Sequence, residues 1–558
     1  MNYDLVFLHP PSVYDFRKKP WFPGYVAGIT RFTPVFEAIP IGFISMAEYA
    51  ERHGYKVKIF NLGEYMLTNP KFDPEEFIKK IQSDFFGIGL HFCVHSQGAL
   101  EIARICKLHH EDSNVVVGGL TATKFSNELI MNHHYVDYVI RGEGEIPLLK
   151  LLDTNYPEEK IPNLLFRDKE GRIKESRLWW SAEDINKFDY TRLDLVDPKN
   201  LLINIYTKLG NIKQWMIPIC RGCLYNCATC GGSRYTYSHM FHRKRTAFRS
   251  KEKIIEDLQK LSDQGVESVF LFGDVRMGGK KYWKSLLKTL TSSDIGVKYL
   301  TMELFTPGNM EFLSEIVRLN NSIKVGLSIS PESGNEMVRT AQGRPYTNES
   351  LIKTAKYCSK NGIRLGVFFM FGLALETEES LEDTYNLCVK LIDLNFENGS
   401  LLYSQPVIRP QFGEMLLLDP GSPAFDNPEK YGYKLLFKTL QDYVNGLSSP
   451  AWSDWLSYET QTSTRRELLE RPRRFDDKII SYYHSIGLIS DEQAEFAHRK
   501  NKIGRIILEE LETIRKIKQV KRKEKRYWAI YRALKSSDKG KLSIFWRIKK
   551  KLGILDLL

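Results

Sequence analysis

Apolar residues in the first part of the chain form short runs that alternate with stretches of helical spacing. Strands are predicted over Leu5–Leu8, Tyr55–Phe60, Phe85–Phe92, Val115–Val117 and Val136–Ile140, and helices over Ile41–Arg52 and Leu100–Leu108. Strands that alternate with helices indicate a parallel sheet with helices on both faces. Such sheets bind ligands at the carboxyl ends of their strands. The turns at Pro10-Pro11, Gly118-Gly119 and Gly142–Gly144 therefore mark the expected ligand edge of residues 1–155.

A second alternating series begins after a connector that is predicted over residues 156–210. Its strands are predicted over Trp215–Ile219, Ser268–Phe272, Tyr299–Phe305, Ile323–Ile329, Leu365–Phe371 and Leu401–Ser404, with helices over 251–264, 281–291, 309–319, 348–360 and 377–394. Six strands separated by five helices predict a (β/α)6 partial TIM barrel over residues 211–415. Residues 416–558 are predicted to be mainly helical. The fold class is therefore α/β, with a Rossmann-like N-terminal domain, a partial barrel and a helical, basic C-terminal extension.

Composition narrows the class of protein. Apolar residues make up 42% and charged residues 27% of the 558 residues, which excludes a disordered or collagen-like chain. No segment reaches the roughly 20 apolar residues that span a bilayer. The N-terminal residues Met1–Asp4 lack the basic region of a signal peptide, so we expect a cytoplasmic protein.

Positive charge is concentrated near the C-terminus. Residues 496–558 contain 20 Lys and Arg against 6 Asp and Glu, a net charge of +14, so residues 1–495 sum to −2 within the total of +12. Basic clusters such as Lys521–Arg526 are interleaved with Tyr527 and Trp528, a composition typical of a helix at a membrane interface. We expect residues 501–558 to contact an anionic membrane surface, which would make the protein peripheral on the inner face of the membrane. Nucleic acid is the weaker alternative for this segment, and a solvated helix is the third.

Four of the eight cysteines lie within eleven residues: Cys220, Cys223, Cys227 and Cys230. The last three have the spacing C-x-x-x-C-x-x-C and follow the first strand of the second series, where barrel folds place their chemistry. Three thiolates can hold a four-iron cluster and leave one iron open for a substrate or cofactor. Zinc is the alternative, and Cys220, His239 or His242 would then supply a fourth ligand. Cys220 is predicted to pack in the strand instead, and the scattered cysteines Cys93, Cys106, Cys358 and Cys388 are predicted to be buried.

The thiol loop at the start of a six-strand βα series resembles the radical S-adenosylmethionine superfamily. The resemblance implies that Cys223, Cys227 and Cys230 hold a [4Fe-4S] cluster whose open iron is chelated by S-adenosylmethionine. It also implies that an electron donor triggers cleavage of S-adenosylmethionine to a 5′-deoxyadenosyl radical, which abstracts hydrogen. In this superfamily the residue before the third cysteine is often aromatic. Here that residue is Thr229, and Tyr225 is the nearby aromatic side chain predicted to contact S-adenosylmethionine.

Further strand ends resemble other segments of the same superfamily. The segment Phe272-Gly273-Asp274 resembles its Gly-Gly-Glu segment, which implies that Gly273 and Asp274 contact the methionine amino group. Glu332-Ser333-Gly334 resembles its Glu-Ser-Gly turn, and Gly366–Glu376 its adenine-side segment. The residues implied for S-adenosylmethionine binding are therefore Tyr225, Gly273, Asp274, Glu332, Ser333, Arg344 and Gly372. Arg344 is expected to face a carboxylate.

The N-terminal domain resembles the cobalamin-binding domain that is fused to many radical S-adenosylmethionine enzymes. The residues implied for cobalamin binding are Pro11, Gly42, Gly118, Gly119, Thr121, Glu143 and Gly144. No Asp-x-His-x-x-Gly follows the first strand, so cobalt is expected to have no histidine ligand from the protein. Cys93–Gly98 imitates that motif after the third strand, but His95 is expected to start a helix or to pack. A domain that keeps the fold without cobalamin remains an alternative.

The resemblance as a whole implies a cobalamin-type radical enzyme, close to archaeal members, that modifies an unactivated carbon. Methylation or the formation of a carbon–carbon bond or ring on a small-molecule or lipid-like substrate is expected. The alternatives are a radical enzyme that modifies tRNA or protein, and a non-catalytic iron–sulfur or cobalamin sensor. The scattered positions of Cys93, Cys106, Cys358 and Cys388 do not suggest the second cluster that thiolation enzymes usually carry.

Overall fold

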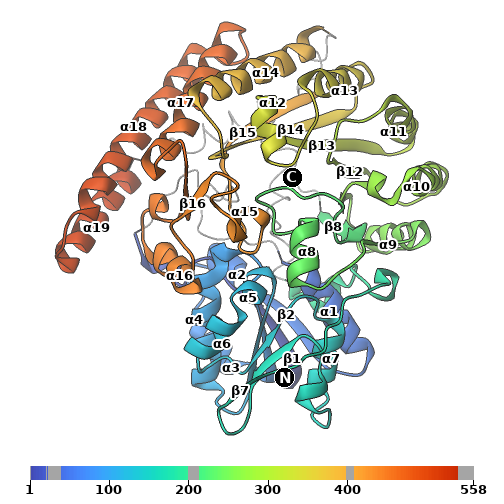
Figure 1. The fold of residues 1–558 in the computed structure, drawn as a ribbon, viewed down its shortest axis with the longest axis vertical. Helices are drawn as coiled ribbons and strands as arrows, with labels where there is room; N and C mark the ends of the chain where they lie inside the picture. Colours follow the sequence, from blue (N-terminus) through green and yellow to red (C-terminus); the bar gives the residue numbers. More distant parts are fainter. Residues whose placement is uncertain (1, 21, 23–38, 199–212, 398–406, 538–558) are drawn as a thin grey trace.

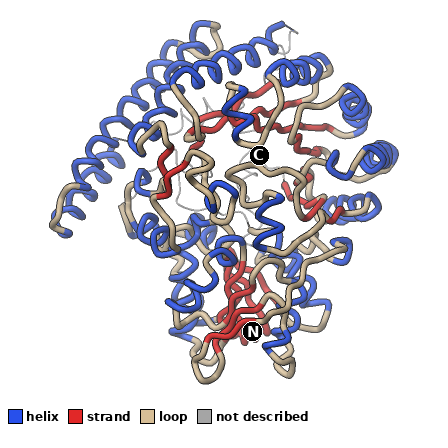
Figure 2. Tube along the Cα trace, viewed as in Figure 1, coloured by secondary structure: helices blue, strands red, loops and turns tan. Residues whose placement is uncertain are grey.

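The computed structural model describes residues 2–20, 22, 39–198, 213–397 and 407–537. It has three parts: an N-terminal sheet with its helices, a curved sheet with helices on its outer face, and a C-terminal helical region that covers one side of the curved sheet (Figure 1). Figure 2 shows the two groups of strands as separate red patches, with helices around each. The α/β class and the two-sheet architecture predicted from the sequence are confirmed.

The N-terminal sheet has the strand order β2-β1-β3-β4-β5-β6-β7. Its parallel strands are β1 (Asn2–His9), β2 (Val57–Asn61), β3 (Gln82–Gly89), β4 (Asn114–Gly118) and β5 (Tyr138–Ile140). The helices between them are α1 (Ile41–Arg52), α2 (Leu62–Thr68), α3 (Pro74–Lys80), α4 (Ser96–His109), α5 (Leu120–Lys124), α6 (Ser126–Asn132) and α7 (Glu145–Leu152). Alternate residues of β1 separate the two faces, because Leu5 and Phe7 share a core with α1 and α7 while Val6 and Leu8 share one with α2 to α4.

The segment predicted as a connector, residues 156–210, differs from that expectation. It contributes β6 (Leu164–Arg167) and β7 (Ile173–Glu175), which pair antiparallel at the edge of the N-terminal sheet. The strands are short, and β7 lies at the edge with Ile173 and Glu175 exposed, so the sequence lacks the alternation that identifies a longer strand. The N-terminal unit therefore extends beyond residue 155.

The second sheet has six parallel strands in the order β15-β14-β13-β12-β11-β8, so β8 and β15 do not pair and the barrel is partial. The strands are β8 (Gln214–Pro218), β11 (Ser268–Phe272), β12 (Tyr299–Leu304), β13 (Lys324–Glu332), β14 (Arg364–Phe371) and β15 (Ile408–Met415). The outer helices are α9 (Lys251–Asp263), α10 (Lys280–Ser292), α11 (Met310–Ser322), α13 (Asn348–Lys360) and α14 (Glu378–Glu397). Five strands agree with the sequence prediction; the sixth, predicted at Leu401–Ser404, falls outside the described residues, and the observed sixth strand begins at Ile408.

The C-terminal region closes one side of the barrel and joins it to the N-terminal domain. It contains α15 (Pro423–Asp426), β16 (Tyr433–Leu435), α16 (Leu440–Ser448), β17 (Tyr458–Thr460), α17 (Arg465–Ser485), α18 (Asp491–Arg515) and α19 (Val520–Ser537). Helix α17 contacts β14, β15 and α14, and α16 contacts α4 of the N-terminal domain (Figure 1). The predicted helical character of this region is confirmed.

Helix α19 does not present all of its aromatic residues to the surface. Tyr527 is buried and lies with its ring 6.0 Å from that of Phe22, and Tyr531 lies 6.3 Å from the same ring. Trp528, by contrast, is exposed. Part of the apolar set that suggested a membrane-facing helix therefore packs against the protein. The leucine-rich stretch after Lys551 falls outside the described residues. Across the described part of the chain, every helix is too short or too polar to cross a membrane.

Candidate functional site

The thiol loop runs from β9 (Cys220–Arg221), directly after β8, to α8 (Arg234–Met240). Backbone hydrogen bonds fix it from two sides. The Ala228 amide donates to the Gln342 carbonyl at 3.1 Å, and the Ala424 amide donates to the Ala228 carbonyl at 2.8 Å. Gly343 fits behind the loop because a side chain there would lie 3.0 Å from the Cys227 Cα. The loop is thus held between the segment after β13 and the C-terminal region.

The structure brings Cys223, Cys227 and Cys230 onto this one loop at the carboxyl end of β8. Backbone amides donate to two of the sulfur atoms, from Tyr225 to Cys223 Sγ at 3.4 Å and from Gly232 to Cys230 Sγ at 3.2 Å. Among the described residues the three thiols do not converge into a ready-made metal-ligand group. Their residue type, spacing and place at the mouth of the barrel fit a four-iron cluster that would draw them together.

Burial and charge both act on these thiols. Burial raises the pKa of Cys223 and of Cys227, and the Arg344 guanidinium acts on Cys227 in the opposite direction. Cys220 lies in β9, with its Sγ 3.7 Å from the Gly222 carbonyl oxygen, as the sequence predicts. The prediction that Cys93, Cys106, Cys358 and Cys388 are buried is also confirmed.

Asp274, which is predicted to accept a hydrogen bond from the methionine amino group, has protein partners on both carboxylate oxygens. Its carboxylate pairs with the Arg276 side chain at 2.6 Å and accepts a hydrogen bond from the Phe305 amide at 2.8 Å. Arg276 in turn donates to the carbonyls of Pro307 and Thr306. This buried carboxylate, with both oxygens hydrogen-bonded, organises the turn after β11.

Glu303, near the end of β12, is the acid that sequence reasoning missed. Its Oε2 accepts a hydrogen bond from the Gly273 amide at 2.7 Å, so it reaches the strand end where Asp274 was expected to act. Burial raises the pKa of Glu303 to about 7, and the nearby Asp274 acts in the same direction. The strand alternates buried Met302 and Leu304 with partly exposed Glu303. That alternation placed Glu303 inside the barrel and could have identified it.

Glu332 and Arg344 lie together beside the thiol loop. Arg344 Nε donates to Glu332 Oε1 at 2.8 Å, so the expectation that Arg344 faces a carboxylate is met by Glu332 itself. The Glu332 Oε2 atom is buried and has no hydrogen-bond partner in the structure. Its backbone has a φ of 65°, a conformation that is costly for a residue other than glycine. A buried carboxylate oxygen without a partner, on a residue with a strained backbone at this mouth, fits a hydroxyl or amino group of S-adenosylmethionine.

The remaining residues predicted to bind S-adenosylmethionine each contact other groups of the protein. Tyr225 packs edge-to-face on Phe305 at 5.7 Å between ring centres, beside the turn after β11. Ser333 is buried, and its Oγ accepts a hydrogen bond from the Asn335 amide. A side chain at Gly372 would meet the Tyr458 hydroxyl at 2.4 Å, so this glycine admits the C-terminal region rather than an open space. Ser333 and Gly372 therefore shape the mouth of the barrel.

Residues predicted for cobalamin line the carboxyl edge of the N-terminal sheet. Gly119, with a φ of 118°, lies so close to the loop after β3 that a side chain would be 2.7 Å from His91 Cα, and Thr121 Oγ1 donates to the His91 carbonyl at 2.9 Å. Pro11 rests on α4, where a side chain at Gly98 would collide with the Pro11 carbonyl oxygen. These contacts hold three strand-end loops together.

Two other glycines leave room at this edge. No described atom lies within 4 Å of the position that a side chain at Gly42 would occupy, and Gly118 has only the Ile140 carbonyl oxygen, at 3.6 Å. The flat corrin ring needs such small residues to approach a sheet edge, so the edge fits cobalamin. His95 is buried and packs edge-to-face against His9 at 5.0 Å, in keeping with a packing role.

Glu143 and Gly144, which are also predicted to contact cobalamin, make close contacts within the protein. The Glu143 carboxylate pairs through Oε2 with Arg221 at 2.9 Å. Its Oε1 accepts a hydrogen bond from Arg243 Nε at 2.7 Å. A side chain at Gly144 would lie 2.5 Å from Met46 Sδ, so this glycine serves tight packing against α1. The two arginine partners of Glu143 could not be predicted from the sequence, because both lie in the barrel domain, far away along the chain.

Exposed apolar side chains lie in the thiol loop and at the carboxyl ends of two barrel strands. Leu224 is 51% exposed beside Cys223, Phe272 is 53% exposed at the end of β11, and Leu375 is 51% exposed after β14. Leu375 also has a φ of 63°, which is strained for a bulky residue. Backbone strain that keeps an apolar side chain exposed at the carboxyl ends of barrel strands points to contact with a ligand.

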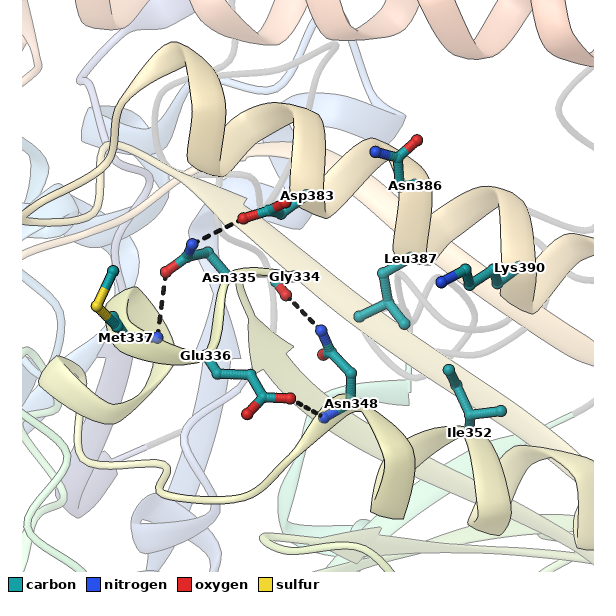
Figure 3. Close-up of a pocket in the computed structure, with 10 residues that line it drawn as sticks. All are labelled: Gly334, Asn335, Glu336, Met337, Asn348, Ile352, Asp383, Asn386, Leu387 and Lys390. Carbon is teal, nitrogen blue, oxygen red and sulfur yellow. Dashed lines mark hydrogen bonds between the residues drawn. The ribbon is translucent and has the colours of Figure 1, made fainter.

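A separate cavity of about 430 Å³ lies outside the barrel, between α12 (Glu336–Ala341), α13 and α14 (Figure 3). Its polar walls pair largely with one another: Asn335 Nδ2 donates to Asp383 Oδ2 at 2.7 Å, and Asn348 Nδ2 donates to the Gly334 carbonyl at 2.7 Å. It backs onto the turn that carries Glu332 but contains none of the three thiols. The residues that line the cavity therefore stabilise the turn that carries Glu332, and the cavity is not the candidate site.

The carboxyl edges of the two sheets meet at the thiol loop. A side chain at Gly231, next to Cys230, would lie 2.3 Å from Cδ2 of Leu120, the first residue of α5 after β4. A side chain at Gly142 would lie 3.5 Å from Phe241, just after α8. The edge expected to bind cobalamin thus directly adjoins the loop expected to hold the cluster.

Two regions of the chain match known protein families. Residues 217–388 match the radical SAM superfamily, and residues 29–152 match the B12 binding domain. The first region contains the three loop thiols, and the second contains the glycines at the edge of the N-terminal sheet.

The relatives found among named proteins have low sequence identity to this chain but align with about two thirds or more of it. The chain is 24% identical to an uncharacterized methyltransferase of Pyrococcus horikoshii, over 66% of this chain and 77% of that protein. It is 20% identical to the cytidylyl-2-hydroxyethylphosphonate methyltransferase of Streptomyces wedmorensis, over 73% of this chain and 82% of the relative. It is also 24% identical to a tRNA-2-methylthio-N(6)-dimethylallyladenosine synthase of Staphylococcus haemolyticus, over 73% and 81%.

Solved structures share the fold over most of this chain. The radical S-adenosylmethionine methyltransferase TsrM of Kitasatospora setae, with cobalamin and a [4Fe-4S] cluster bound, superposes with a TM-score of 0.55 at 15% identity, over 78% of this chain and 77% of that one. The cobalamin-dependent radical enzyme OxsB, with aqua-cobalamin bound, gives a TM-score of 0.57 at 14% identity, over 91% and 73%. At such identities the likeness shows the fold.

Proposed function

We propose that this chain, a radical S-adenosylmethionine enzyme that carries a B12-binding domain, transfers a methyl group to an unactivated carbon of a small organic substrate. The observation that carries the proposal is the contact between Gly231 of the thiol loop and Leu120 at the edge of the N-terminal sheet. Cofactors held on these two edges would face one shared space. The methyltransferases among the relatives support the same reaction type.

Each side chain of the site has a distinct task in this proposal. When bound, the cluster with S-adenosylmethionine supplies the one-electron chemistry that attacks a saturated carbon, and cobalamin supplies the methyl group. Cys223, Cys227 and Cys230 would hold the cluster. Glu303 would accept a hydrogen bond from the methionine amino group in place of Asp274, and Glu332 Oε2 would accept one from a hydroxyl of the same cofactor.

The substrate is proposed to have an apolar portion. Leu224, Phe272 and Leu375 would contact it at the mouth of the barrel, because burying exposed apolar surface favours binding. This supports a lipid-like or otherwise greasy molecule but also fits a small apolar metabolite. Ring or carbon–carbon bond formation is the alternative outcome of the same radical chemistry.

Anaerobic reconstitution tests the proposed function. We expect the purified full chain, reconstituted with iron, sulfide and hydroxocobalamin, to retain corrinoid after desalting and to transfer methyl from S-adenosylmethionine to cobalt in its fully reduced form. The measurement is the ultraviolet–visible spectrum together with extraction and quantification of the corrinoid. A chain that holds the cluster and cleaves S-adenosylmethionine but retains no corrinoid would contradict methylation and favour cobalamin-free radical chemistry.

A basic face on α19 supports a further proposal, contact with an anionic membrane surface. Lys521, Arg522 and Lys525 are exposed, and Trp528 lies among them with 37% exposure. Each such cation contributes about 1 kcal/mol at an anionic surface. The buried Tyr527 reduces the apolar contribution, so the proposed contact is mainly electrostatic.

Neutralising this face is expected to abolish binding to vesicles. The triple variant Lys521→Gln, Arg522→Gln and Lys525→Gln should lose most co-sedimentation with anionic vesicles at low salt, by about a hundredfold in affinity from three lost contacts of about 1 kcal/mol each. The matched control replaces three exposed lysines on other helices: Lys281→Gln, Lys288→Gln and Lys356→Gln. Equal sedimentation of all three proteins would contradict membrane contact through α19. RNA binding lost only in the α19 variant would favour the tRNA alternative, which the Staphylococcus haemolyticus relative supports.

A further inference from the structure

Four charged side chains with little exposure to solvent form ion pairs between the two domains, close to the thiol loop. Arg221 of β9 pairs with two carboxylates that follow β5. Its Nη1 lies 2.9 Å from Glu143, and its Nη2 lies 2.7 Å from Glu145, the first residue of α7. Arg243, which follows α8, donates from Nε to Glu143 at 2.7 Å. We call Glu143, Glu145, Arg221 and Arg243 the interdomain ionic network. Two of its members lie in the N-terminal domain and two in the barrel.

The network is almost entirely withdrawn from water. The side chains of Glu145 and Arg243 are 2% and 3% exposed, and that of Arg221 is 16% exposed. Removing charges from water opposes folding, and apolar residues of equal volume would often stabilise a protein as well or better. What an arginine fork with two carboxylates does provide is a fixed relative orientation, because several hydrogen bonds must form at once.

Neighbouring groups form further hydrogen bonds with the members of the network. The Ser45 hydroxyl donates to Glu145 Oε1 at 2.8 Å, the Ala182 amide donates to Glu143 Oε2 at 2.9 Å, and Arg221 Nη2 donates to the Tyr190 hydroxyl oxygen at 3.1 Å. Burial acts to raise the pKa of Glu145, yet the opposing effect of Arg221 prevails and this pKa is lowered. Glu145 is therefore an anion held by its partner.

Backbone strain marks the same place. Of the described residues other than glycine, four have a positive φ, and two of these adjoin the network. Asn163, with a φ of 64°, donates from its side chain to the Glu143 carbonyl at 2.9 Å. His242, with a φ of 51°, directly precedes Arg243. Asparagine and histidine tolerate this conformation better than most residues. Here the positive φ accompanies the hydrogen bond from Asn163 to Glu143 and the position of His242 directly before Arg243.

The network lies next to the chemistry without touching it. Arg221 is two residues before Cys223, and its strand β9 pairs with β10 (Ala247–Phe248). Glu143 and Glu145 follow β5 at the edge that is expected to bind cobalamin. A displacement of Arg221 relative to Glu145 would therefore change the separation of the two cofactor edges.

We propose that the interdomain ionic network is a positioning device that sets the distance between the cluster and the N-terminal domain. Arg221, Arg243, Glu143 and Glu145 are positioning residues that act through the thiol loop and the loop after β5. The benefit of a fixed distance rests on the proposed methyl transfer between the two edges, but the distance itself is measurable without it.

A pulsed electron paramagnetic resonance distance tests the proposal on the reconstituted full chain. A nitroxide attached at Met131→Cys, an exposed position on α6, reports its distance from the reduced cluster and needs no corrinoid. We expect a single narrow distribution for the labelled parent protein. Glu145→Gln and Arg221→Met are each expected to broaden or shift it. Glu145→Gln leaves Arg221 with Glu143 as its one anionic partner in the network, and Arg221→Met leaves the buried Glu145 without its cation.

The matched control is Asp257→Asn, which disrupts the buried pair of Asp257 with Arg249. Both residues lie in the barrel domain, and the hydrogen bond from Arg249 to the Ile185 carbonyl uses a different guanidinium nitrogen from those that reach Asp257. This variant removes an equally buried charge but is expected to leave the distance distribution unchanged. Glu145→Gln keeps the shape of the side chain, so it decides the question if Arg221→Met does not fold. An unchanged distribution in Glu145→Gln, or equal broadening in Asp257→Asn, would overturn the proposal. Corrinoid content, measured on the same samples, reports separately on the proposed function.

Discussion

Replacing Cys227 by alanine is expected to remove the iron–sulfur absorption at roughly 400 nm and all cleavage of S-adenosylmethionine. In the proposal, this chain supplies three thiolate ligands to the cluster. Without Cys227 only two thiolates remain, and these are too few to hold it. Cys223→Ala and Cys230→Ala are expected to have the same effect. The measurements are the anaerobic absorption spectrum, the iron and sulfide content, and 5′-deoxyadenosine quantified after addition of a reductant.

Cys220→Ala is the matched control for this result. Cys220 lies only three residues before Cys223, in β9, with its sulfur near the Gly222 carbonyl. It is expected to keep both the cluster and the cleavage reaction. Loss of the cluster in Cys220→Ala as well as in Cys227→Ala would indicate a different ligand set, and zinc in the purified protein would support that reading. A full cluster in Cys227→Ala would exclude the assignment.

The fold could be predicted where the sequence repeats one physical pattern. The strand Ser268–Phe272 and the helix Asn348–Lys360 begin and end where the apolar spacing places them, because each buries one face in a regular layer. The strands β6 and β7 could not be predicted. They are short and antiparallel, and their pairing at the sheet edge depends on contacts with β5 that no local pattern records.

The site was predictable at the level of the loop and less so at the level of side chains. Cys223, Cys227 and Cys230 are identified by spacing alone, since three thiols so close in sequence must be close in space. The roles of Asp274 and Glu143 depend on their partners. Arg276 and the pair Arg221 with Arg243 occupy these carboxylates, and which cation reaches which anion is decided by tertiary packing. Glu303 was missed for the converse reason, because a strand-interior acid carries no motif.

Glu303→Gln is expected to weaken binding of S-adenosylmethionine by about 10- to 150-fold, the range that corresponds to a lost hydrogen bond to a charged acceptor. Glutamine keeps an oxygen for the Gly273 amide, so the turn after β11 should remain intact. The measurement is calorimetric titration of the reconstituted protein under anaerobic conditions. Glu267→Gln is the control, because Glu267 lies before β11 at the opposite end of the barrel strands and pairs with Lys298. Wild-type affinity in Glu303→Gln with loss in Asp274→Asn would return the role to Asp274.

The raised pKa of Glu303 gives this assignment a second, independent signature. Burial raises the pKa to about 7, above the usual value of 4.5, so the protonated carboxyl is favoured in the free protein below neutral pH. Its contribution to folding stability is present below about pH 4.5 and is lost as the pH rises through about 7. Its ability to accept a hydrogen bond from the methionine amino group changes in the opposite direction and increases through the same range. The amino group of the cofactor titrates as well, so the ratio of the wild-type affinity to that of Glu303→Gln at each pH isolates the carboxyl. We expect this ratio to rise between about pH 6 and pH 8, and a ratio independent of pH would show that Glu303 does not contact the cofactor.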